Sequence, residues 1–238
     1  MLELGVKILL AYLLGTLLGS LILGHLRGVD IRSMGSGNAG ATNALRTQGK
    51  LFGFLVLIVD IAKGVFTVWW LPTAVLPAIG IDPDLPREWL TVACGFAVIV
   101  GHVYPVWFGF RGGKGAATMV GVVAGMELRL LVPLLVSWFL VLVLWGYVSL
   151  ATMLSGAALV LAVCILEPND VPLLSFCAAM TLFVVYTHRS NIARLRAGQE
   201  SRVRRLGAVL GAIRRGSAVA WDIVRRSPSR LNYARSGP

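Results

Sequence analysis

The chain has 238 residues, of which 57% are hydrophobic and only 14% charged, and its mean hydropathy is +0.79. Soluble domains usually hold about 45–50% apolar and about 25% charged residues, so this composition excludes an ordinary soluble domain and favours a polytopic membrane protein. The net charge of +11 is uneven, because 12 of the 22 basic residues lie from Arg189 onward. On a membrane chain, such a basic tail favours contact with anionic lipid over nucleic-acid binding.

Hydropathy predicts an all-α membrane protein with seven transmembrane helices. The start, Met1-Leu2-Glu3, lacks a basic n-region, so the first span is expected to be retained. Each span needs roughly 17–25 apolar residues, and the fourth is short, about a dozen residues. In chain order the spans are Leu4–Leu26, Leu51–Leu71, Glu88–Phe108, Gly115–Met126, Arg129–Trp145, Leu150–Leu166 and Pro172–Thr187.

The charges of the loops predict the orientation. Alternate loops collect most basic residues, including Arg46, Lys114 and the whole tail, whereas the other loops hold only Lys7, Arg87 and Arg129 among many carboxylates. The positive-inside rule then puts the N-terminus outside and the C-terminus in the cytoplasm. This arrangement, with the two termini on opposite sides of the membrane, requires all seven spans. We therefore predict a membrane domain over residues 1–200 and a basic cytoplasmic tail over 201–238, either an interfacial amphipathic helix or a disordered segment.

Three hydrophilic, glycine-rich clusters interrupt the apolar sequence, and all fall on the predicted cytoplasmic side. The first spans residues 35–43, where glycines let backbone amides approach a ligand closely. Its neutral donors are Ser36, Asn38, Thr42 and Asn43, and Arg46 follows with a charge suited to phosphate. A membrane protein tolerates such a segment where it lines a wet site or lies at the surface.

The second cluster is Arg111-Gly112-Gly113-Lys114-Gly115, directly before a predicted helix. A glycine-rich turn, a lysine and a helix N-terminus together suit a phosphate group. The Walker spacing is absent, so nucleotide binding does not follow.

The third cluster is His188-Arg189-Ser190-Asn191, after the last span. His188 is either a general base or a neutral donor to phosphate. None of the three clusters carries a carboxylate, and together they have the chemistry of an anion pocket.

Two further polar positions lie in or near the spans. Asp60 and Lys63 share one helical face of the second span, where they either neutralise each other or place Lys63 near the pocket. His102 lies near the inner end of the third span, where a structural role explains it at least as well as a functional role.

The sequence gives no sign of a metal or another cofactor. Cys94, Cys164 and Cys177 match no metal spacing and are expected to be buried thiols. No catalytic triad can be recognised.

Taken together, these segments resemble the acyl-phosphate:glycerol-3-phosphate acyltransferases of bacteria, the PlsY family. The resemblance runs through about Glu200. It rests on the sequence around each cluster and on two further motifs, Asp60-Ile61-Ala62-Lys63-Gly64 and Gly101-His102-Val103-Tyr104-Pro105. One departure is that Trp145-Gly146 precedes Tyr147-Val148-Ser149, where family members often have Arg before Tyr.

The resemblance implies a seven-helix enzyme of the bacterial cell membrane with its site at the cytoplasmic face. Its reaction would move an acyl chain from acyl phosphate to the 1-hydroxyl of sn-glycerol 3-phosphate, giving lysophosphatidate and phosphate, the first acylation of phospholipid synthesis. The implied site residues are Ser36, Arg46, Lys114 and His188 for catalysis, Asn38, Thr42, Asn43, Ser149 and Asn191 for binding, and Gly112, Gly113 and Gly115 for the donor's phosphate.

A transporter of phosphorylated metabolites is the alternative function. Transport predicts polar residues at the bilayer midplane and on both sides. Here only Asp60 and Lys63 are within a span, and the clusters share one side, which favours an enzyme.

Overall fold

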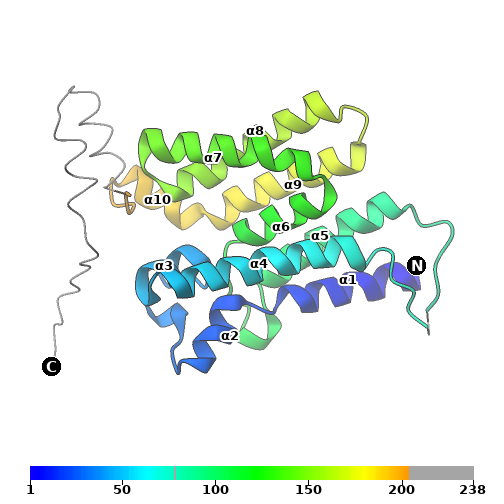
Figure 1. Ribbon diagram of the computed structural model, residues 1–238, viewed down its shortest axis with the longest axis horizontal. Coiled ribbons are helices and arrows are strands. Elements are labelled where there is room, and N and C mark those ends of the chain that lie inside the picture. Colours follow the sequence, from blue (N-terminus) through cyan, green and yellow to red (C-terminus); the bar gives the residue numbers. More distant parts are fainter. Residues whose placement is uncertain (78, 204–238) are drawn as a thin grey trace.

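A computed structural model describes residues 1–77 and 79–203, so most of the predicted tail lies outside the described residues. The described residues form ten α-helices and three short 3-10 turns, with no strand among them. Figure 1 shows most of the longer helices side by side along the long axis of the molecule. The helices are α1 (Leu2–Gly15), α2 (Gly19–Leu26), α3 (Ala41–Gln48), α4 (Lys50–Trp70), α5 (Arg87–Val103), α6 (Ala116–Met126), α7 (Leu131–Trp145), α8 (Val148–Leu166), α9 (Val171–Thr187) and α10 (Arg189–Arg196).

Four of the described helices are long and apolar enough to cross a membrane. They are α4 and α8 by themselves, and α5 and α7 when the adjoining 3-10 turns are included. Two bent pairs raise this number to as many as six: α1 with α2, at 46°, and α9 with α10, at 57°. The prediction of an all-helical integral membrane protein is confirmed. The predicted fourth span is α6, whose 11 residues rise only about 16 Å against a hydrocarbon core of about 30 Å. The count of seven therefore stays a prediction.

The exposed side of α7 is as apolar as its buried side. On α7, Val132, Val136 and Phe139 are more than 60% exposed, whereas Leu134 and Leu142 are buried. Such a surface suits lipid on one side and helix packing on the other. Cys94 and Cys177 are buried as predicted, but Cys164 is exposed on α8, so the expectation of a core thiol was wrong there.

The predicted first span is broken between α1 and α2, and a buried ion pair stabilises the break. Lys63 Nζ donates to the carbonyls of Gly15 (2.9 Å) and Leu17 (3.0 Å), and Asp60 Oδ1 accepts from the Gly19 amide (3.3 Å). Nζ also lies 3.1 Å from Asp60 Oδ1. The pair thus supplies partners to backbone groups that the break leaves open, which an apolar environment requires. The predicted pairing of Asp60 with Lys63 is confirmed, and it has this additional purpose.

Glycines bring α6 into backbone contact with α4. A methyl group on Gly121 would collide with the carbonyl of Ile61, and one on Gly64 or Gly125 would also meet the partner helix. Small residues allow this close approach between membrane helices. The contacts of Gly121 with Ile61 and of Gly125 with Val65 show that α4 and α6 run in the same direction. Ile61 lies 11 residues into α4 and Gly121 lies five residues after the start of α6, so the start of α6 lies about 9 Å along α4. The second cluster, which directly precedes α6, therefore lies beside the first turns of α4 rather than beyond its end.

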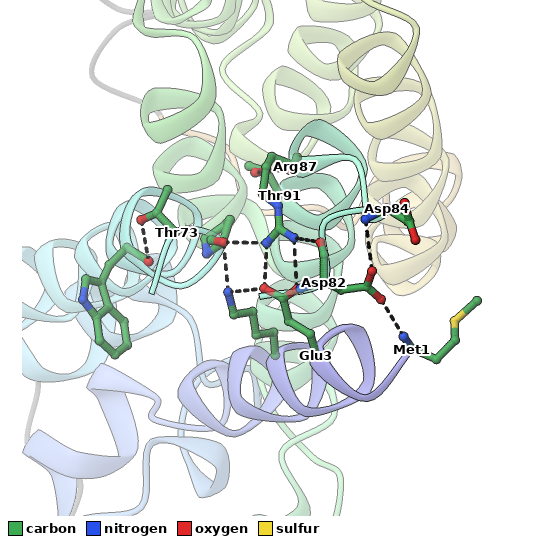
Figure 2. Close-up of polar contacts among 10 residues, drawn as sticks. Met1, Glu3, Thr73, Asp82, Asp84, Arg87 and Thr91 are labelled. Atoms are coloured by element: carbon green, nitrogen blue, oxygen red, sulfur yellow. Dashed lines mark hydrogen bonds and ion pairs between the residues drawn. The ribbon is translucent and has the colours of Figure 1, made fainter. Parts of the chain in front are cut away.

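The opposite end of the bundle is held by an ionic cluster, here called the distal cluster, which consists of Glu3, Lys7, Asp82 and Arg87 (Figure 2). Glu3 and Lys7 are buried, whereas Asp82 and Arg87 are partly exposed. Lys7 Nζ lies 2.8 Å from Glu3 Oε1, and Arg87 donates to both oxygens of Glu3 at 2.6 and 3.0 Å. The Asp82 amide donates to Glu3 Oε2 at 2.7 Å. This cluster joins α1, the loop after α4 and the start of α5, far from the three glycine-rich clusters.

Candidate active site

One cavity of about 380 Å³ brings the three clusters together. Its wall includes every residue predicted for the site except Gly112 and Gly113: Ser36, Asn38, Thr42, Asn43, Arg46, Lys114, Gly115, Ser149, His188 and Asn191. These residues come from the loop before α3, from α3, from the start of α6, from α8 and from the α9–α10 junction. Segments separated by more than 100 residues in the chain therefore meet at one place.

In the first cluster, Asn43 shapes the loop that carries Ser36. Its side-chain amide donates to the carbonyls of Ile31 (3.1 Å), Met34 (2.9 Å) and Asn38 (3.0 Å), and its Oδ1 accepts from the Ser36 amide (3.0 Å). Asn43 is only 2% exposed. Its hydrogen-bonding groups are thus occupied by backbone, which gives Asn43 a scaffolding role. Ser36 itself is exposed at the cavity.

In the second cluster, Gly112 and Gly113 hold the turn against α5. Their amides donate to the carbonyls of Val103 and His102, both at 3.1 Å. A methyl group on Gly112 would collide with the His102 carbonyl, and one on Gly113 with the His102 ring. These two amides are therefore engaged within the protein. Gly115, with a φ of +85°, precedes α6, whose first-turn amides have no partner within the helix.

A chain of polar contacts joins the second cluster to the third. Lys114 Nζ donates to Asn191 Oδ1, and Asn191 Nδ2 donates to Glu200 Oε1 at 2.6 Å. Ser149 Oγ donates to the same carboxylate at 2.8 Å, and Arg194 Nε at 2.7 Å. Glu200 also lines the cavity.

The sequence interpretation missed Glu200. It described three clusters without a carboxylate and did not place Glu200 among the site residues. Glu200 follows α10 by a short turn, and nothing in its local sequence marks it as part of the site. A cation-rich cavity with buried amide donors is the signal that could have suggested a carboxylate partner.

Burial and neighbouring charges shift the pKa values of two groups in this set of polar contacts. Burial, reinforced by nearby Arg194, lowers the pKa of Lys114 to about 8. Burial alone would raise the pKa of Glu200, but the hydrogen bonds from Asn191, Ser149 and Arg194 lower it below its ordinary value. At neutral pH Glu200 is therefore an ionised carboxylate held by three donors, and the nearby Lys114 gives up its proton more readily than usual.

His188 has one ring nitrogen committed and one available. Nδ1 lies 2.8 Å from the carbonyl of Val184, which can only accept, so Nδ1 carries the proton. Nε2 is left with a lone pair, and His188 is among the residues that line the cavity. Burial lowers the pKa of His188 to about 4, so the ring is neutral at physiological pH.

The turn before Ser149 is supported by an arginine from beyond α10. Arg202 Nε donates to the Trp145 carbonyl at 3.0 Å, and its guanidinium lies 5.8 Å from the centre of the Tyr147 ring. The Arg202 side chain also covers Gly146, which has a φ of +78°. An arginine thus stands beside this turn although the sequence has glycine at the position before Tyr147.

The cavity continues from its polar half into an apolar half between α6, α7 and α8. Met119 and Val120 contribute from α6, and Leu134, Leu135 and Trp138 from α7. Leu134 lies 11 residues from the end of α7, about 16 Å along the helix. Among the described residues, no group of three or more His, Cys, Asp or Glu could hold a metal ion. The arrangement suits a ligand with an anionic head and an apolar chain.

Comparisons with known proteins agree with this chemistry. The family model described as glycerol-3-phosphate acyltransferase matches residues 6–198. The glycerol-3-phosphate acyltransferase of Geotalea daltonii is 40% identical over 196 residues, which cover 82% of this chain and 95% of that protein. The enzyme of that name from Staphylococcus aureus is 40% identical over 203 residues, covering 84% and 97%.

Two solved structures have a similar fold. The crystal structure of PlsY (YgiH), an integral membrane glycerol 3-phosphate acyltransferase, in its glycerol 3-phosphate form, has a TM-score of 0.74 and 35% identity. Its lysophosphatidic acid form has a TM-score of 0.72 and 34% identity. Each alignment covers 84% of this chain and 94% of the other.

Proposed function

Since the chain belongs to the glycerol-3-phosphate acyltransferase family, we propose that its cavity is the place where glycerol 3-phosphate is acylated to lysophosphatidate. The resemblance predicted from the sequence motifs is confirmed at the level of the family. The chain is an enzyme of this class.

The proposed acyl donor is an acyl phosphate, and the proposed acceptor group is the 1-hydroxyl of glycerol 3-phosphate. The observation that carries this assignment is the continuity of one cavity, with amide and cationic donors in one half and apolar side chains of α6 and α7 in the other. An acyl phosphate is divided in the same way, into an anionic phosphate and an apolar acyl chain. Its chain would lie in the apolar half while its phosphate meets the α6 N-terminus, where unpaired amides favour an anion.

Arg46 and Lys114 would neutralise the two phosphate groups, which the reaction must bring close together. Gly115 and the first-turn amides of α6 would stabilise the charge that develops on the leaving phosphate. Ser36 would add a donor at the mouth of the cavity. Asn191 holds the Lys114 side chain directly, and Glu200 accepts from both Asn191 and Ser149 and so fixes their orientation.

In the chemical step, the substrate hydroxyl oxygen attacks the acyl carbonyl carbon, and the bond from that carbon to the phosphate oxygen breaks. The phosphate leaves with the bonding electrons. His188 Nε2 would accept the hydrogen bond of the attacking hydroxyl and orient it. A group with a pKa of about 4 is a weak base at neutral pH. The proton therefore goes to a substrate phosphate oxygen, whose second pKa is about 6.

We further propose seven membrane crossings, with the N-terminus outside and the cavity facing the cytoplasm of a bacterial cell. Contacts between loops support this parity. Arg32 donates to the Phe108 carbonyl at the end that carries the clusters, whereas Arg129 pairs with Glu167 at the distal end. The loops that the charge count assigns to opposite sides thus lie at opposite ends of the helices. In this arrangement soluble glycerol 3-phosphate arrives from the cytoplasm.

The test is acyl transfer by purified protein in detergent, with acyl phosphate and labelled glycerol 3-phosphate. The expected product is labelled lysophosphatidate, formed without acyl-CoA or acyl carrier protein. If only acyl-CoA supports product formation, the donor assignment fails. Uptake of label into vesicles without lipid product would instead indicate the transporter alternative.

A further inference from the structure

The segment that follows α10, residues 200–203, lies against the turn between α7 and α8 and is here called the clasp. It lies beyond residue 198, where the match to the family model ends. Glu200 and Ser201 line the cavity, and Arg202 and Val203 contact the turn. Arg202 and Val203 have no role in the mechanism proposed above.

Two donors of the clasp bind the carbonyls at the end of α7. Arg202 Nε donates to the Trp145 carbonyl at 3.0 Å, and the Val203 amide donates to the Gly146 carbonyl at 2.8 Å. The last carbonyls of a helix have no partner within it, and a cation is favoured beside them. The turn before Ser149 therefore obtains these two hydrogen bonds from a segment 57 residues later in the chain.

Val203 adds an apolar contact to these hydrogen bonds. It packs against a hydrophobic cluster of α7 and α8 that Trp138 and Val148 also contact. Trp138 and Val148 belong to the cavity wall, and Val148 directly precedes Ser149. The clasp is thus joined to the cavity wall through the backbone of the turn and through apolar side chains.

The other end of the clasp reaches the polar half of the cavity. Glu200 Oε1 accepts from Ser149 Oγ at 2.8 Å and from Asn191 Nδ2 at 2.6 Å, and Asn191 Oδ1 in turn accepts from Lys114. Glu200 lies only two residues before Arg202, and two residues of extended chain span at most about 7 Å. Binding of Arg202 to the turn therefore restricts where the Glu200 carboxylate can lie.

We propose that the clasp positions Ser149 and Asn191, and through Asn191 also Lys114, and that Arg202 and Val203 are positioning residues of this enzyme. They act through the turn and through Glu200 rather than by touching a substrate. The assignment of this part of the cavity to phosphate rests on the proposed function.

Displacement of the clasp should also change the ionisation of Lys114. The charge of Glu200 raises the pKa of Lys114 and opposes the effect of burial. When Glu200 moves away, this pKa should fall, and Lys114 should lose its proton at a lower pH. Loss of the Arg202 charge by itself would move the pKa in the opposite direction, because it removes a like charge.

The test compares the double variant Arg202→Ala/Val203→Ala with Arg196→Ala in the full-length protein. Arg196 is an exposed arginine of α10 outside the cavity. For the double variant we expect kcat/KM for glycerol 3-phosphate to fall about 10- to 100-fold, because small displacements at a reacting site have such effects. Arg196→Ala should stay within about twofold of the unaltered protein.

A second readout distinguishes positioning from a structural role alone. Inorganic phosphate is titrated calorimetrically over a range of pH, and its affinity should begin to decline at a lower pH in the double variant than in the unaltered protein. A lower melting temperature with unchanged kcat/KM, or with an unchanged pH dependence of phosphate binding, would overturn the proposal.

Gly146→Ala tests the same contact from the side of the turn. A methyl group at this position would lie 2.9 Å from Cγ of Arg202 and push that side chain away. Arg202→Ala removes the collision, so Gly146→Ala/Arg202→Ala should have a kcat/KM within about threefold of Arg202→Ala alone. Losses that multiply would mean independent sites and would contradict the proposal.

Hydrogen exchange of the unaltered protein covers the case in which the variants do not fold. We expect the Val203 amide, which is bonded to Gly146, to exchange at least about tenfold more slowly than an unstructured amide. Exchange at the unstructured rate would contradict the proposal.

These outcomes separate the inference from the proposed function. If the unaltered protein fails to acylate glycerol 3-phosphate, the function fails, yet the pH dependence of phosphate binding still tests the clasp. If acylation proceeds and the double variant matches the unaltered protein, the role of Arg202 and Val203 alone is overturned.

Discussion

The distal cluster and the buried group of Asp60, Lys63 and His102, here called the central cluster, are both ionic groups, but only in the distal cluster does every carboxylate oxygen have a hydrogen-bond partner. Each oxygen of Glu3 accepts from two donors, supplied by Lys7, Arg87 and the Asp82 amide. In the central cluster, by contrast, Asp60 Oδ2 has no partner, and both Asp60 and His102 line the cavity. Figure 2 shows how closely the groups of the distal cluster surround Glu3.

This difference separates a structural role from a functional one. The distal carboxylates have no unpartnered oxygen left for a ligand, so their role is to hold α1, α5 and the loop between α4 and α5 together. The central cluster beside the cavity does have one, Asp60 Oδ2, and a buried polar group without a partner requires an explanation. Substitutions at the distal end should therefore affect stability, and substitutions beside the cavity should affect turnover.

The largest effect on turnover is expected for Lys114→Ala. Loss of the ammonium leaves a substrate phosphate without its cation, and we expect the rate of lysophosphatidate formation to fall about a thousandfold. The melting temperature in detergent should change little, because Lys114 is half-buried and its burial disfavours its charge. Lys50→Ala, at an exposed lysine outside the cavity, is the matched control. Near-normal turnover of Lys114→Ala would remove Lys114 from the site.

A smaller loss is expected for Gly113→Ala. The added methyl group would collide with the His102 ring and displace the turn that carries Lys114. A shift of about 1 Å at a reacting site costs about a hundredfold, so we expect kcat/KM to fall by about that factor. Gly5→Ala serves as the control, since nothing lies within 4 Å of a methyl group there. Unchanged kcat/KM in Gly113→Ala would show that this turn does not depend on the central cluster.

The pH dependence of phosphate binding should report Lys114. Bound phosphate favours the charged lysine, whose pKa in the free protein is lowered by burial to about 8. As pH rises through 8 the free protein loses this proton, so affinity should fall by up to about tenfold for each further pH unit. In Lys114→Arg, the guanidinium keeps its charge and the decline should move to higher pH. The same decline in both proteins would mean that another group is responsible.

The smallest effect on turnover is expected at the distal cluster. Glu3→Gln removes the carboxylate but leaves Lys7 buried, so we expect the melting temperature to fall by roughly 5–10 °C. The kcat of the protein that remains folded should stay within about twofold of the original. Glu88→Gln, at an exposed carboxylate on the same side, is the control. A large loss of kcat without a loss of stability would contradict the proposal that the distal cluster has a structural role and the central cluster a functional one.

The sequence alone determined the chemistry of this protein. Its apolar runs predicted a helical membrane protein, and the three glycine-rich clusters predicted an anion site. The donors of these clusters are properties of the residues themselves, so they can be recognised before any fold is known. Ser36, Arg46, Lys114, His188 and Asn191 were identified in this way, whereas Ser149 was assigned through the family resemblance, and all six line one cavity.

Only the tertiary structure determined the partner of each group. Glu200 became part of the site because its position after α10 places it beside Ser149 and Asn191. Asn43 proved to support the loop around Ser36, and the Asp60–Lys63 pair proved to stabilise a helix break. Hydropathy alone missed that break, although it did predict that the fourth span is short. The physical reason is that a hydrogen bond depends on distances of about 3 Å between segments that packing, not sequence order, brings together.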